Sequence, residues 1–227
     1  MKIENFITPP ATMPNGLQAT VDGLWVCDQA TDDLYLLDEN LNILKTLNTT
    51  AENSSGLTVG DGSLWIASNG QSKSRYRRVT DTNFSGVIRC DYETGVEISR
   101  FPTPDSGGIH GLEWVDGLLW ITAFNPKAIV LVNPKNGSVI KKVEVPWERL
   151  HGLAWVGDGM WCAHTSDKVI VKYDIDTGEE IDKIIYNNTD PAPHGLTFWN
   201  GNLWSCDANW PEPIHPQGPS ISKILQF

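Results

Sequence analysis

A five-fold internal repeat constrains the fold of this 227-residue chain more than any other feature. Each copy opens with a Gly-Leu pair and carries a Trp nine residues after that Gly. Self-similarity of this kind indicates that one supersecondary unit recurs along the chain. The pairs begin at Gly16, Gly56, Gly111, Gly152 and Gly195, and the tryptophans are Trp25, Trp65, Trp120, Trp161 and Trp204.

The residues between these landmarks predict the local structure of each copy. An Asp-Gly or Asn-Gly dipeptide, such as Asp61-Gly62, stands between the Gly-Leu pair and the Trp, and it tolerates the positive φ of a tight hairpin turn. Two more short strands follow in most copies, as in 128–133 (AIVLVN) and 139–145 (VIKKVEV). Four antiparallel strands recurring about every 40 residues are typical of a β-propeller blade. The sequence therefore predicts an all-β, five-bladed propeller with four antiparallel strands in each blade.

One propeller domain is expected to span residues 1–227. The fifth copy lacks a fourth strand, and Lys2–Pro9 (KIENFITP) resembles the fourth strands of the other copies. We therefore expect this first strand to close the ring by pairing into the last blade, which removes two exposed sheet edges. The repeat tryptophans are expected to fill the gaps between blades. The blades cover about 16–48, 56–103, 111–146, 152–187, and 195–227 together with 2–9.

Composition narrows the classes of partner. Asp and Glu number 28 and Lys and Arg number 17, for a formal charge of −11, which disfavours binding to nucleic acid. No apolar run reaches the roughly 20 residues of a membrane span. No secretion signal is visible at the N-terminus, and the four cysteines form no CxxC pair, so reduced thiols in a cytoplasmic protein are expected. A closed ring has no sheet edge that demands a partner, so we expect a monomer.

The propeller geometry brings distant residues to one end of the central channel. In each first hairpin, the residue before Gly-Leu and the residue three after the Trp should face each other within one residue of register. The pairs are Asn15 with Asp28, Ser55 with Ser68, His110 with Ala123, His151 with His164, and His194 with Asp207. Four of the five histidines thus belong to this ring, and the fifth, His215, lies in a loop on the same face.

Three hypotheses explain the histidines. His110, His151 and His194 could hold a divalent metal ion such as Mg, Mn, Zn or Fe, with Asp207 or Asp28 supplying negative charge. Alternatively, the imidazoles could perform acid–base chemistry without a metal, with Asp207 orienting His194. In the third hypothesis they only line the channel mouth. For catalysis we single out His194, Asp207, His164 and His215, the last two as groups that could move a proton.

Two long insertions frame the same face. Residues 69–86 carry a basic cluster with Arg75 and Tyr76, suited to an anionic group on a substrate. Residues 208–220 hold several prolines that would stiffen a wall over the channel. The predicted substrate-binding residues are Asn15, Asp28, Ser55, Arg75, Tyr76, Phe124, Trp210 and Glu212.

The segment PAPHGLTFWNGNLWSCD (191–207) resembles the streptogramin B lyase (virginiamycin B lyase-type) family of propellers. The resemblance implies a Mg²⁺-dependent lyase that opens a cyclic depsipeptide by elimination. By position, His194 matches the catalytic histidine of that family and Asp207 the acidic residue that supports its metal site. That family has seven blades and a Glu at the acidic position, and both features differ here.

The blade number instead resembles the plant-type glutaminyl cyclases, which place Gln or Glu before the repeat Gly where this chain has Asn15 and Ser55. The combined expectation is an enzyme, a lyase or hydrolase, that processes a small molecule at the channel mouth with metal assistance. The alternatives are a non-catalytic propeller that binds a small ligand, and an acyltransferase similar to glutaminyl cyclase.

Overall fold

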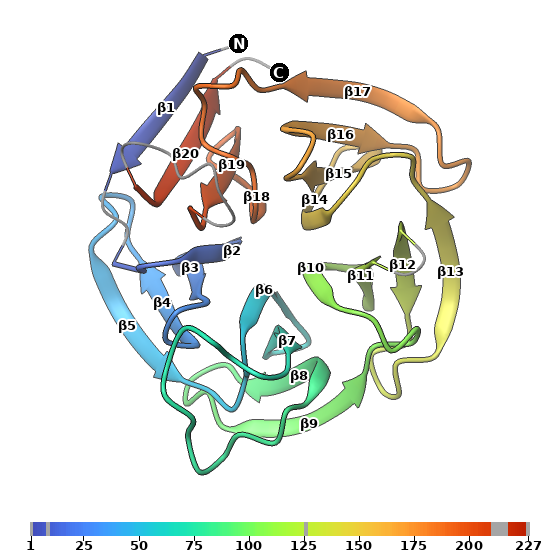
Figure 1. Ribbon diagram of the computed structural model, residues 1–227. Helices are drawn as coiled ribbons and strands as arrows, with labels where there is room; N and C mark the ends of the chain where they lie inside the picture. The colour runs from blue at the N-terminus through green and yellow to red at the C-terminus, as the bar shows by residue number, and fades with distance from the viewer. Residues whose placement is uncertain (1, 8–9, 125–126, 210–217, 226–227) are drawn as a thin grey trace.

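The protein is a five-bladed β-propeller of twenty strands, seen down its axis in Figure 1. The computed structural model describes residues 2–7, 10–124, 127–209 and 218–225. Each blade is an antiparallel sheet of four strands, with one strand near the axis and one at the rim. The predicted fold class is confirmed.

The strands are grouped into five sheets in chain order, apart from the first strand. Blades one and two comprise β2 (Pro14–Thr20), β3 (Gly23–Asp28), β4 (Asp33–Leu37), β5 (Ile43–Asn48), β6 (Ser54–Gly60), β7 (Ser63–Asn69), β8 (Ser85–Asp91) and β9 (Glu97–Pro102). Blades three and four comprise β10 (Ile109–Val115), β11 (Leu118–Phe124), β12 (Lys127–Val132), β13 (Val139–Glu144), β14 (Leu150–Val156), β15 (Gly159–His164), β16 (Val169–Tyr173) and β17 (Glu180–Ile185). Blade five comprises β18 (Leu196–Trp199), β19 (Asn202–Asp207), β20 (Ser220–Leu225) and β1 (Lys2–Ile7).

The first strand closes the ring. β1 pairs antiparallel with β20, from Lys2 opposite Leu225 to Ile7 opposite Ser220, and forms the rim strand of blade five. Figure 1 shows the two chain ends beside each other at this blade. The expected closure by the N-terminal strand is therefore confirmed.

The hydrophobic core is divided into five clusters, one at each junction between blades. At the junction of blades one and two, Trp25 packs with Leu57, and at the next junction Trp65 packs with Leu112. The Leu of each Gly-Leu pair thus faces the preceding blade and the repeat Trp faces the following one. The other three junctions pair Trp120 with Leu153, Trp161 with Leu196, and Trp204 with Leu17.

The repeat glycines explain why the inner strands can approach one another so closely. A Cβ on Gly56 would lie 1.8 Å from the carbonyl oxygen of His110, and one on Gly111 would lie 2.0 Å from that of His151. Only a residue without a side chain permits this contact. Gly56 and Gly111 therefore each contact the backbone of the next blade, at the residue that precedes the repeat glycine of that blade.

Two further observations concern the remaining sequence expectations. The described residues contain no helix long and apolar enough to cross a membrane. All four cysteines are buried and unpaired, and burial raises the pKa of the Cys90 thiol to about 12. Thiols of this kind are poor nucleophiles at neutral pH.

Candidate functional site

A bulge at the start of the inner strand positions the ring residues at the channel mouth. Registers shift between Pro14 and Gly16 and at the equivalent place in blades two, three and four. The residue before the repeat Gly is therefore the extra one, and a bulge re-aims the side chain of such a residue. These residues are Asn15, Ser55, His110 and His151, and His194 occupies the equivalent place just before β18.

Three of the predicted histidines come together. The rings of His110 and His151 are stacked, with centroids 4.0 Å apart and planes inclined by 24°. The ring of His194 meets that of His151 edge-on, with centroids 4.7 Å apart. We call these three residues the histidine stack. The convergence that the repeat predicted is present in the structure.

The middle ring of the stack is its most unusual member. His151 is fully buried, and neither of its ring nitrogens has a hydrogen-bond partner among the described residues. Burial, the neighbouring imidazoles and Arg149 lower its pKa well below the usual value. Burial and Arg149 likewise lower the pKa of His110. Both rings are therefore neutral at neutral pH.

His194 is held in a defined tautomer. Its Nδ1 lies 3.0 Å from the carbonyl oxygen of Ala192, which can only accept, so Nδ1 carries the proton. The carboxylate of Asp207 lies 3.5 Å from the same nitrogen and accepts hydrogen bonds from the backbone N–H groups of Ala192 and Asn209. In the neutral ring the lone pair is therefore on Nε2.

His164 does not join the histidine stack, contrary to its predicted pairing with His151. Its cross-strand partner is Leu150, which belongs to the hydrophobic core between blades three and four. The His164 ring is buried, packs against Trp147 and is hydrogen-bonded to the Tyr173 hydroxyl at 2.9 Å. Burial lowers its pKa to about 4. The one-residue bulge in β14 puts the two histidines on different faces, as a register shift of one must.

Blades one and two fill their part of the mouth with amides and hydroxyls. Asn15 donates to Gln29 at 2.6 Å, and Gln29 donates to Asn53 at 2.7 Å. Asn69 donates to the Ser55 hydroxyl at 2.7 Å, which in turn donates to the Ile109 carbonyl. We call Asn15, Gln29, Asn53, Ser55 and Asn69 the amide arc. Within it, only Asn15 Oδ1 is buried with no hydrogen-bond partner in the described part of the chain.

Asp28 is buried, and its carboxylate is hydrogen-bonded to the loops before β2 and after β3. Its two oxygens accept hydrogen bonds from the backbone N–H groups of Thr12, Met13 and Ala30 and from two threonine hydroxyls. This carboxylate therefore stabilises the entry to β2, and its predicted role in substrate binding has no support in these contacts.

The basic insertion of blade two is fixed by ion pairs. Arg75 binds Asp32 at 2.6 Å and Asp81 at 2.7 Å, so its guanidinium is already neutralised by two carboxylates. Asp81 first and then Asp32 raise the pKa of Arg75. Tyr76, in contrast, is 97% exposed. The Arg75 guanidinium is thus bound to carboxylates of the protein itself, and the roles of Arg75 and Tyr76 in substrate binding stay predictions.

Several predicted residues lie outside the described part of the chain. His215, Trp210 and Glu212 fall within 210–217, which the structure does not describe. Phe124 ends β11, and its side chain is likewise outside the description.

Two residues near the axis escaped the sequence reasoning. Arg149 stands two residues before His151, is half-buried and adopts a positive φ of 48°. Glu113 occupies the inner strand of blade three, accepts a hydrogen bond from the Trp155 N–H at 3.3 Å, and has its pKa raised to about 8 by burial. A signal for Glu113 was available, because the other blades place Gln18, Thr58, Ala154 and Thr197 there, none of which is ionisable.

The described residues provide no complete ligand set for the predicted metal ion. Among the described residues, no three His, Cys, Asp or Glu side chains are arranged to hold one. The lone pair of an imidazole lies in the ring plane, and zinc binds it at about 2.0–2.1 Å. Two rings stacked 4.0 Å apart, with planes inclined by only 24°, hold their lone pairs in nearly parallel planes that do not converge on one centre at bonding distance. The described ligands therefore provide no coordination set.

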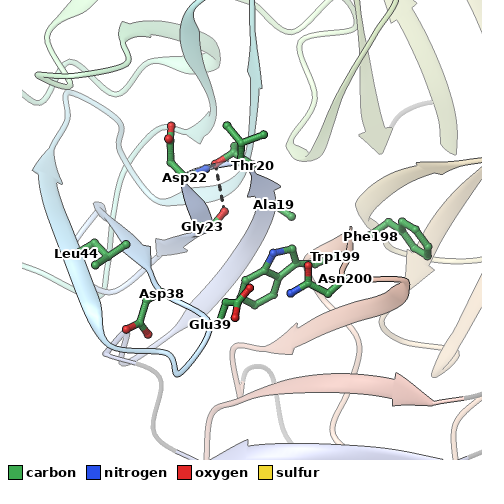
Figure 2. Close-up of a pocket in the computed structure, with 11 residues that line it drawn as sticks. Ala19, Thr20, Asp22, Gly23, Asp38, Glu39, Leu44, Phe198, Trp199 and Asn200 are labelled. Carbon is green, nitrogen blue, oxygen red and sulfur yellow. Dashed lines mark hydrogen bonds between the residues drawn. The ribbon is translucent and has the colours of Figure 1, made fainter.

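A recess also opens at the other end of the propeller, between blades five and one (Figure 2). It has a volume of about 610 Å³ and is lined by the ends of inner strands and by turns, including Asp22, Asp38, Glu39, Phe198 and Trp199. Asp38 accepts three hydrogen bonds from its own turn, and Asp22 accepts one from Tyr92. Asp38 and Asp22 are thus already hydrogen-bonded, and no histidine lines the recess.

Comparison with known proteins identifies structural relatives only. No protein-family model matches the chain, and no curated protein matches it in sequence. Glutaminyl cyclase of Myxococcus xanthus is similar in structure, with a TM-score of 0.69 and 13% identity over 97% of this chain and 93% of that one. Virginiamycin B lyase of Staphylococcus aureus has a TM-score of 0.54 and 16% identity over 98% and 70%.

A WD40 propeller domain, that of Doa1, is also similar, with a TM-score of 0.55 and 16% identity over 85% of this chain and 61% of that one. Structural similarity at identities this low establishes only a shared propeller fold. It does not carry an activity from one protein to another.

Proposed function

We propose that the channel mouth is the active site of an enzyme that processes a small molecule by imidazole acid–base chemistry, as a lyase or hydrolase. The observation that carries the proposal is the burial of His151 with both ring nitrogens unsatisfied by the described protein. An unsatisfied buried polar group costs about 1–3 kcal/mol, so its retention calls for a function.

The three histidines have different roles in this proposal. His194 is the general base, because its Nδ1–H is fixed on the Ala192 carbonyl and its lone pair is then on Nε2. Asp207, at 3.5 Å from Nδ1, stabilises the imidazolium that forms when His194 takes up a proton. His110 and His151 stay neutral because of their lowered pKa values, so they act as hydrogen-bond partners that position and polarise the substrate.

His194 Nε2 removes a proton, either from a substrate carbon next to a carbonyl in an elimination or from a water that attacks a carbonyl carbon in a hydrolysis. The protonated His194 then gives this proton to the leaving group as the bond between that group and the substrate breaks. In both cases negative charge develops on an oxygen of the substrate. A neutral imidazole N–H from the stack would stabilise that charge at a buried site, where such a hydrogen bond is strong. No step requires a metal, in keeping with the ring geometry.

The test is a turnover screen of esters, amides, lactones and peptides with N-terminal Gln, read by mass spectrometry. His194→Gln is expected to lower any activity found at least about a hundredfold, the usual contribution of a general base. Ile140→Gln is the control, because Ile140 is exposed on β13, the rim strand of blade three. Full activity of His194→Gln would contradict the proposal, and the absence of any turnover would favour the non-catalytic binding propeller.

Removal of metal separates the two chemical hypotheses. Incubation with a chelator is expected to leave the activity of the wild-type enzyme within about twofold, well below the effect of losing a general base. Loss of activity in chelator, followed by recovery with a divalent ion, would favour metal assistance and contradict the stated role of the stack.

A further inference from the structure

Arg149 differs from every other arginine of the chain in its surroundings. The sequence has six arginines, and five of them donate to a carboxylate or a carbonyl. Arg149 has no hydrogen bond or ion pair from its guanidinium to any residue that the structure describes. It is nonetheless half-buried, in a chain with a net charge of −11. Arg149 thus lacks a described carboxylate partner although Asp and Glu outnumber Lys and Arg by 28 to 17 in the chain.

Arg149 stands two residues before His151, at the start of the strand that carries this member of the histidine stack. It directly precedes β14, and its backbone carbonyl accepts a hydrogen bond from the Thr165 N–H, which anchors the segment to the neighbouring strand. Its positive charge acts on both His110 and His151 and contributes to the lowered pKa of each. The guanidinium therefore lies within electrostatic reach of two members of the stack.

The backbone of Arg149 is also unusual. A φ of 48° is uncommon for a residue with a long side chain. The equivalent residues of blades two and three are Asn53, also at positive φ, and Gly108, and both types accept this conformation readily. A conformational cost kept at a site is a pointer to function. At this site the residue with the unfavourable φ is the positively charged Arg149.

We infer that Arg149 anchors a singly charged carboxylate on the ligand of the channel mouth, beside the buried ring of His151. This inference rests on the proposed function and specifies the class of its substrate. The planar fork of a guanidinium matches the two oxygens of a carboxylate. Because His110 and His151 are neutral, the site offers one positive charge, which balances a monoanion and leaves part of a dianion unpaired.

The experiment measures ligand binding through the ring ¹⁵N signals of the five histidines in uniformly labelled protein. Propionate is the probe, propionamide is its neutral isostere, and inorganic phosphate is the competing anion. Propionate is expected to shift the His110 and His151 signals saturably and to bind about tenfold or more tightly than propionamide, as expected for hydrogen bonds to a charged group.

Two variants assign that preference to Arg149. Arg149→Asn removes the charge with a residue that tolerates positive φ, and it is expected to lose the preference for propionate over propionamide. Arg149→Lys keeps the charge without the fork and should retain part of it. Arg89→Gln is the matched control, because Arg89 binds Asp61 and Ser63 at the β6–β7 turn of blade two, away from the channel mouth.

The possible results are decisive. The inference is overturned if propionate does not shift the stack, if propionamide or phosphate binds as tightly, or if Arg149→Asn keeps the preference within twofold. The proposed function is judged separately, by the activity of His194→Gln. An intact carboxylate preference in Arg149→Asn, together with loss of turnover in His194→Gln, would remove the inference alone.

Discussion

The channel mouth has two unlike arcs, the amide arc of blades one and two and the histidine stack of blades three to five. In the amide arc, Asn69 is bonded on both sides, to Ser55 and to the backbone N–H of Ile109. In the histidine stack, His151 is fully buried but satisfies neither nitrogen within the described protein. Equivalent positions of one repeat thus serve different ends, because one arc binds the blades together and the other retains hydrogen-bonding capacity.

Fold stability should be most sensitive to substitution where the two arcs meet, between blades two and three. Gly56 of blade two lies against the His110 carbonyl of blade three, where a Cβ would come within 1.8 Å. Gly56→Ala is expected to destabilise the fold by more than about 4 kcal/mol, since backbone must move on both sides. Urea unfolding, or loss of soluble protein, measures the effect.

Gly62→Ala provides the comparison for that variant. Gly62 has a φ of 65°, but a Cβ there would meet nothing within 4 Å. Its cost should be only about 1 kcal/mol, from backbone conformation alone. Equal losses for the two variants would show that close approach of the inner strands is not what requires the repeat glycine.

Within the amide arc, Asn69→Ala is expected to cost about 2 kcal/mol of unfolding free energy. It removes the donor to Ser55 and leaves the Ile109 N–H without its acceptor at 2.8 Å. Chemical denaturation reports the change. Asn202→Ala removes one exposed turn contact and should change stability by less than about 0.5 kcal/mol. A similar effect of both variants would mean that the arc does not hold the blades together.

Within the histidine stack, His151→Phe should do the reverse and stabilise the protein by about 1 kcal/mol at pH 7, because it removes unsatisfied buried nitrogens. The gain should increase below pH 6.5. There the unfolded wild-type chain takes up a proton at His151 and the folded chain, with its lowered pKa, does not, so the wild type loses stability as pH falls.

Thermal unfolding of both proteins between pH 5 and 7 measures this difference. Arg149, His110, His194 and His164 all act on His151 and are unchanged in the variant. A loss of stability comparable to that of Asn69→Ala would contradict the contrast between the two arcs.

The repeat was sufficient to predict the fold, because the spacing of Gly-Leu and Trp sets both the hairpin register and the core at each blade junction. The same spacing predicted the convergence of His110, His151 and His194. It was insufficient for His164, since a one-residue bulge reverses which face a side chain takes and leaves no mark in the spacing. Arg149 was missed because its distinguishing features are a backbone angle and the lack of a described partner, which only coordinates reveal.

The pairing of β1 with β20 also has a consequence for how the molecule assembles. Every other blade is built from strands that follow one another along the chain, so each can form from local hairpins. Blade five alone needs both ends of the polypeptide, and contacts so distant in sequence form slowly. The other four blades can therefore form before β1 pairs with β20. We expect this six-residue strand to close the ring last and to detach first when the protein unfolds.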